Sequence, residues 1–169
     1  MIDFIRKMDR NELLKLIEVY AKNWLTHDGC WFLAAEETYE METAMDLDRK
    51  SWHRFAAAEA KRIVRAFNIP ENGGLDSLKR AFNYRLYAAI NEQKTERPDD
   101  QTLIFTMERC KVQETRRRKG LPDFPCKPVG IIEFTRFAQA VDPRIQTRCI
   151  QCPPDDTGDV YCKWEFSID

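Results

Sequence analysis

The spacing of apolar residues changes near residue 98, and this change constrains the fold more than any other feature of the sequence. Before it, apolar side chains recur every three or four residues, which is the spacing of an amphipathic helix. After it, the stretch 160–168 alternates apolar and polar side chains, as a strand with one buried face does. The two patterns predict an α+β fold in one domain over residues 1–169. A helical layer in 1–94 packs on a small antiparallel sheet with two further helices in 95–169.

Four helices are predicted between residues 9 and 93. The first begins with a capping box formed by Asp9 and Glu12. Asp28 and Asp48 each suit the cap of a further helix, and a proline and a glycine pair separate the third helix from the fourth. The predicted boundaries are marked by residues that cap, end or break helices: Asp9, His27, Asp28, Asp48, Pro70, Gly73 and Gly74.

The second half combines strands and helices. A polar turn is predicted at 95–101, and Gly120 closes a short helix. Pro128 suits the first turn of a longer helix, which Asp142 and Pro143 end. The predicted strands, which are rich in β-branched and aromatic residues, lie at 102–110, 144–152 and 160–168.

Charge and hydropathy exclude two classes of partner. Lys and Arg number 27 and Asp and Glu number 28, so the formal net charge is −1. Such a chain has no positive field to gather phosphates, and nucleic acid is not an expected partner. No stretch reaches the roughly 18 uninterrupted apolar residues that span a bilayer, and the N-terminus lacks a signal-peptide pattern. We therefore expect a cytoplasmic protein with reduced cysteines and no membrane partner.

Cysteines are the first group of candidate functional residues. Cys149 and Cys152 form a C-x2-C pair, but no second such pair exists in the chain. Four thiolates could hold a tetrahedral zinc ion if the fold brings Cys110 and Cys126 beside this pair. The alternative is that all of these thiols are free. Cys162 shares the apolar face of its predicted strand and is expected to pack in the core.

Two polar residues interrupt the apolar stripes of the predicted helices. His27 continues the stripe of the first helix, so it is expected to be at least half buried, either as a helix-end histidine or as a base in a pocket. Glu59 lies inside the stripe of the third helix and needs a partner. It is expected either to pair with an arginine or to act as a pocket carboxylate. Trp24 and Trp31 are expected to bound that pocket.

Five segments carry a resemblance to a known group of proteins. They are 24-WLTHDGCWF-32, 109-RCKVQETRRRKGLPDFPCKPVG-130, 143-PRI-145, 149-CIQCPPD-155 and 162-CKWEF-166. The chain resembles an uncharacterised prokaryotic cytosolic family related to the L-2-amino-thiazoline-4-carboxylic acid hydrolase-like proteins. The resemblance implies helices covering a small antiparallel sheet, with a pocket between the layers.

Hydrolysis of a thiazoline ring requires an activated water or thiolate, a base, and a cation for the substrate carboxylate. The resemblance implies that His27 or Glu59 could serve as the base and that Cys126 or Cys110 could serve as nucleophile or metal ligand. Arg116, the first residue of the basic run RRRK, could bind the carboxylate. The rest of that run is expected to form a solvated face.

Asp28 is a further candidate for ligand binding. Three hypotheses of function follow. The first is a small-molecule-binding module of unknown ligand. The second is a hydrolase of a small cyclic amide or imine carboxylate that uses a Cys, His or Glu site. The third is a domain stabilised by zinc. Homo-oligomers are compatible with each of them.

Overall fold

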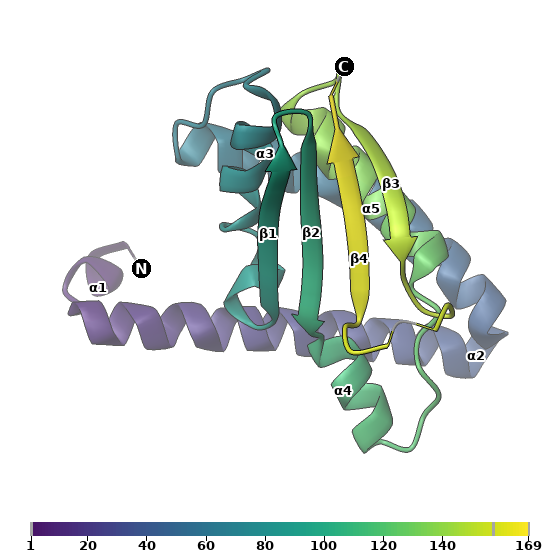
Figure 1. Cartoon of the computed structure of the whole chain (residues 1–169). Helices are drawn as coiled ribbons and strands as arrows, with labels where there is room; N and C mark the ends of the chain where they lie inside the picture. Colours follow the sequence, from purple (N-terminus) through teal and green to yellow (C-terminus); the bar gives the residue numbers. More distant parts are fainter. Residues whose placement is uncertain (1, 157, 169) are drawn as a thin grey trace.

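A computed structural model describes residues 2–156 and 158–168, and it has the predicted α+β fold (Figure 1). Long and short helices surround one face of a four-stranded antiparallel sheet. The elements follow in the order α1 (Ile2–Arg6), α2 (Arg10–Ala66), α3 (Gly74–Phe82), the 3-10 helix η1 (Leu86–Ala89), β1 (Glu92–Asp99), β2 (Thr102–Arg109), α4 (Lys111–Arg118), α5 (Lys127–Val141), β3 (Gln146–Gln151) and β4 (Cys162–Ser167).

Helix α2 spans residues for which three separate helices were predicted. The capping box at its start is confirmed, because the backbone N–H groups of Asp9 and Glu12 each donate to the other's carboxylate over 2.9 Å. The predicted helix starts at Asp28 and Asp48 are wrong, since both residues lie inside α2. The interruption instead falls at Glu40, whose φ of 72° and ψ of 165° are not helical.

The kink at Glu40 turns α2 back on itself. Its first part runs as a rod along one end of the sheet and extends beyond it, and its second part runs behind the sheet beside α5 (Figure 1). The two parts therefore approach the sheet from different directions. In residues 2–156 and 158–168 no helix is both long enough and apolar enough to cross a membrane.

The sheet has the strand order β1-β2-β4-β3, and every neighbouring pair is antiparallel. The three predicted strands are confirmed as β2, β3 and β4. Strand β1 was not predicted: residues 92–99 were expected to form the end of a helix followed by a turn, and that prediction is wrong. Strand β1 is an edge strand with charged residues on one face, so it lacks the apolar alternation that marks the other strands.

Helix α5 packs on the sheet closely enough to require a glycine. A Cβ atom added at Gly130 would lie 2.7 Å from Cζ2 of Trp164, a fully buried residue of β4. Phe134, one turn further along α5, has its ring centroid 4.8 Å from that of the same tryptophan. As predicted, Pro128 lies in the first turn of α5, and Asp142 caps its end.

Candidate functional site

A pocket of about 270 Å³ lies between the two parts of α2, η1 and α4. The kink at Glu40 creates it, because Asp48 and Trp52 from the second part of α2 come to face residues 25–33 from the first part. Eight of the lining side chains are apolar or aromatic: Leu25, Phe32, Leu33, Trp52, Tyr87, Val112, Leu121 and Phe124. A wider hollow of about 570 Å³ on the outside of α2 is lined by that one helix alone and encloses nothing.

Two carboxylates, Asp28 and Asp48, line this apolar pocket. Burial raises the pKa of Asp28, although nearby His27 lowers it. The pKa of Asp48 rises from 3.8 to about 7, first through burial and then through the negative charges of Asp28 and Glu133, against a hydrogen bond from the Trp52 side chain. Across the described residues, no lysine or arginine forms an ion pair with Asp28 or Asp48.

A buried ion cluster lies behind the pocket, centred on Arg85. Its Nε donates to Oε2 of Glu59 over 3.0 Å, and its Nη2 donates to Oε1 of Glu133 over 2.7 Å. The backbone N–H of Leu86 also donates to Glu59, over 3.1 Å. Burial disfavours the charged guanidinium, but the two glutamates raise the pKa of Arg85 above its ordinary value. Burial also raises the pKa of Glu133, against the pull of Arg85.

The ion cluster and the pocket share their aromatic walls. The rings of Trp52 and Tyr87 stack with centroids 5.7 Å apart, and Cζ of Arg85 lies 5.9 Å from each ring. The pKa of Tyr87 is raised well above its ordinary value, mainly by burial and then by the charges of Glu133 and Asp28. The pocket carboxylates and the ion cluster therefore belong to one electrostatic network.

Helix phase explains where the predicted pocket residues lie. Asp28 lines the pocket, as expected of a ligand-binding residue. His27 is exposed, so its predicted burial is wrong, and Trp31 is also exposed, with 70% of its surface accessible. These two residues are four positions apart, on the face of α2 that points away from the pocket. Trp24 is half-buried and lies behind the pocket wall, 5.5 Å from the Tyr87 ring.

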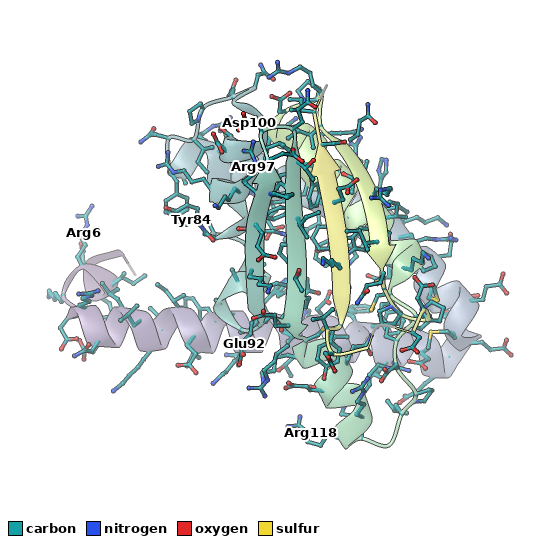
Figure 2. All side chains as sticks on the ribbon, viewed as in Figure 1. Arg6, Tyr84, Glu92, Arg97, Asp100 and Arg118 are labelled. Atoms are coloured by element: carbon teal, nitrogen blue, oxygen red, sulfur yellow. The ribbon has the colours of Figure 1, made fainter. Side chains whose placement is uncertain are left out.

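Glu59 and Arg116 are buried and already paired. Glu59 binds Arg85, which is the ion pair that the sequence left open as one alternative. Arg116 lines the pocket but donates to both carboxylate oxygens of Glu36, over 2.8 and 3.0 Å. It is the one arginine of its run that points inward, whereas Arg118 extends away from the sheet at the end of α4 (Figure 2).

Four cysteines gather near the start of α5 and the ends of β3 and β4. The Cys152 thiol is buried, and hydrogen bonds with Cys126 and Cys162, together with burial, raise its pKa. Cys149 also bonds to Cys152, and burial is the main cause of its raised pKa. Burial raises the pKa of Cys110 to about 12. Nε2 of Gln113 donates to Sγ of Cys126 over 3.0 Å.

This arrangement revises the predicted metal ligands. Cys126 joins the C-x2-C pair as expected, and Cys162 packs against the core but also belongs to the thiol group. Within the part of the chain that the structure describes, no three His, Cys, Asp or Glu side chains are arranged to hold a metal ion. The candidate set of Cys110, Cys126, Cys149 and Cys152 is therefore not a formed metal centre.

Sequence reasoning missed Asp48, Trp52 and Tyr87 as pocket residues. Asp48 was interpreted as a helix cap, because aspartate is common there. The signal that could have found it is the one that marked Glu59, an acid between apolar residues of one helical stripe. Tyr87 lies in a short 3-10 helix that has no sequence period of its own.

Comparison with known proteins gives a family but no activity. Neither curated proteins nor solved structures give a match. No link to the L-2-amino-thiazoline-4-carboxylic acid hydrolase-like proteins is shown, so that resemblance stays a prediction. Residues 6–168 match a family of unknown function, DUF6125. Because this match covers nearly all of the 169 residues, the chain belongs to that family.

Proposed function

We propose that the protein binds a small molecule in the pocket between the two parts of α2, η1 and α4. The observation that carries this proposal is the pair Asp28 and Asp48, two desolvated carboxylates that face one apolar cavity without a cation as partner. Desolvating a carboxylate without a cation to pair with it destabilises the folded state when the group is charged. Such groups persist where they serve binding or catalysis.

The size and lining of the cavity fit a compact ligand. Binding pockets for small molecules are typically about 300–1,000 Å³ and mostly apolar, with a few polar groups that orient the ligand. At about 270 Å³ this cavity lies just below the lower end of that range. A ligand with a single ring and one or two polar substituents would fill it.

A pocket-filling variant tests the proposal. Gly29 lines the pocket, and a Cβ atom added there would have nothing within 4 Å. Gly29→Leu should therefore fill the cavity without disturbing the backbone, and it removes a glycine that weakens the helix by about 1 kcal/mol. The exposed position Ala34 on the same helix offers a matched control, Ala34→Leu.

The assay is ligand-observed NMR with single-ring fragments that are cationic, neutral or anionic. We expect binding to the natural chain and to Ala34→Leu, and loss of binding in Gly29→Leu with an unchanged circular dichroism spectrum. Equal binding to Gly29→Leu would place the ligand elsewhere and refute the proposal.

A hydrolase of a small cyclic amide or imine carboxylate is the second candidate. One observation favours it: Asp48 has a pKa of about 7 beside a second carboxylate, which suits a general base near neutral pH. Asp48 would then take the role expected of His27 or Glu59, since His27 is exposed and Glu59 is paired. Mass spectrometry separates the candidates, because a binding protein returns L-2-amino-thiazoline-4-carboxylic acid unchanged.

A zinc-stabilised domain is the third and weakest candidate. The thiol group of Cys126, Cys149, Cys152 and Cys162 has the donor chemistry that zinc prefers. Binding would require these side chains to move, because their present arrangement does not form a metal site among the described residues. Elemental analysis of the purified protein tests this candidate, and a zinc content near one per chain would support it.

A further inference from the structure

We infer that the pocket ligand is a compact organic cation, with an ammonium, amidinium or guanidinium group held between Asp28 and Asp48. This inference rests on the proposed function and specifies the chemistry of the ligand. It derives from three observations: the excess of buried acid, the aromatic walls, and the pairing of the nearby bases.

The charge of the buried network is the first observation. Two carboxylates, those of Glu59 and Glu133, bind the one buried guanidinium of Arg85, and those of Asp28 and Asp48 line the adjoining pocket. When both are ionised, Glu59 and Glu133 exceed the single positive charge of Arg85, and Asp28 and Asp48 form no ion pair with a lysine or arginine among the described residues. The chain relieves part of this excess by favouring the protonated form of its acids, as the raised pKa values of Asp28 and Asp48 indicate. A cationic ligand would relieve it directly and would allow both aspartates to ionise.

Arg85 provides an internal example of the proposed binding mode. Its guanidinium lies between two carboxylates and within 5.9 Å of the centroids of four aromatic rings, those of Trp52, Tyr87, Phe134 and Phe137. The pocket repeats this combination on the other side of the shared wall, with two carboxylates and the rings of Trp52 and Tyr87. The combination of acid and aromatic groups is a recurring environment for organic cations.

The bases of α4 do not neutralise the two aspartates. Nζ of Lys111 lies 2.7 Å from Glu114, and Arg116 is bound to Glu36. Arg118 and Lys119 are exposed at the edge of the pocket. None of these four bases is among the causes of the pKa shifts of Asp28 and Asp48: burial raises the pKa of Asp28, and burial with the charges of Asp28 and Glu133 raises that of Asp48. Arg116, the buried base of the pocket lining, is thus neutralised by Glu36, whereas Asp28 and Asp48 have no lysine or arginine partner among the described residues.

Three isosteric probes test the inference. Benzamidine, benzamide and benzoate have similar shapes and carry charges of +1, 0 and −1. Titrations at pH 8 by isothermal calorimetry give their affinities for the full chain. A charge-assisted hydrogen bond contributes about 1.5–3 kcal/mol, so we expect benzamidine to bind at least about 10-fold more tightly than benzamide. Benzoate should bind most weakly.

Variants assign the preference to the two aspartates. Asp28→Asn and Asp48→Asn should each reduce the preference for benzamidine over benzamide by about 10-fold and leave the affinity for benzamide within about 2-fold. Asp46→Asn is the matched control, because Asp46 lies on the same helix and pairs at the surface with Arg49 and Lys50. It should change nothing. Circular dichroism verifies that each variant is folded.

The outcomes separate the inference from the proposed function. Equal affinities for benzamidine and benzamide, both abolished by Gly29→Leu, would overturn the cation inference and keep the pocket. Tighter binding of benzoate would assign the ligand to the bases of α4 and also overturn it. If no probe binds at millimolar concentration, both the inference and the pocket function fail.

Discussion

Replacing Asp48 with asparagine should stabilise the protein, and the gain should grow with pH. The carboxylate has a pKa of about 7 in the folded chain and an ordinary value of 3.8. Because the folded pKa is raised, the fold favours the neutral acid, and stability present at low pH is lost as the pH rises through this interval. One pKa unit corresponds to about 1.4 kcal/mol, so complete ionisation would cost about 4 kcal/mol in a fully sheltered site.

Asp48 is only partly buried, which reduces the expected effect to about half, ~2 kcal/mol at pH 8. Asparagine keeps an oxygen that can accept the hydrogen bond from Trp52 and carries no charge. We therefore expect Asp48→Asn to unfold at higher urea concentration than the natural chain. Its advantage should be larger at pH 8 than at pH 5 by about 1 kcal/mol.

Urea unfolding followed by tryptophan fluorescence at pH 5, 6, 7 and 8 measures this difference. Asp46→Asn serves as the control, because its carboxylate forms surface ion pairs that lower its pKa. That variant should show no gain at pH 8. Parallel pH profiles for the natural chain and Asp48→Asn would refute the argument that burial and neighbouring acids hold Asp48 near neutrality.

Three other features give predictions. Glu40→Gly should raise the free energy of unfolding by about 1 kcal/mol, because a φ of 72° with a ψ of 165° suits only glycine. The control Glu42→Gly, inside the helix, should lower it by about 1 kcal/mol. If urea unfolding shows that both variants change the stability in the same direction, the kink at Glu40 is contradicted. Arg85→Met should lower the free energy of unfolding by about 3–5 kcal/mol, because it leaves Glu59 and Glu133 buried without a cation. A loss below about 1 kcal/mol in the same assay would show that the two glutamates are protonated or hydrated. Cys110 and Cys152 should react with Ellman's reagent only after unfolding, since their raised pKa values disfavour the thiolate; a chelator that exposes new thiols in the folded chain would show that a metal protects them.

The general architecture could be predicted because it depends on short-range patterns. The alternation along β4 and the capping box of Asp9 and Glu12 both arise from local geometry, and both are confirmed. The kink could not be predicted, because Glu40 is a good helix former in the middle of a helical pattern. The bidentate pair of Arg116 with Glu36, 80 residues apart in sequence, fixes the helix close to that turn.

The candidate site was predicted only where a local pattern marks a residue. Glu59 was recognised because a buried acid needs a partner, and its partner Arg85 is now evident. Asp28 and Asp48 could not be placed together from sequence, since their proximity depends on the reversal of α2. His27 and Trp31 were placed in the pocket from stripe spacing, but that stripe is not covered along the first part of α2.

Because the kink lies at Glu40, a change of angle there would move the whole first part of α2 as one rigid helix. Asp28 is 12 residues from Glu40 and Arg10 is 30 residues from it, which correspond to about 18 Å and about 45 Å along a helix. A rotation of about 5° at the kink would displace Asp28 by about 1.6 Å and Arg10 by about 4 Å. A ligand that draws Asp28 and Asp48 together would therefore displace the N-terminal end of α2 further than it displaces Asp28. Spin labels at Arg10 and on β1 would detect that displacement as a change in their separation.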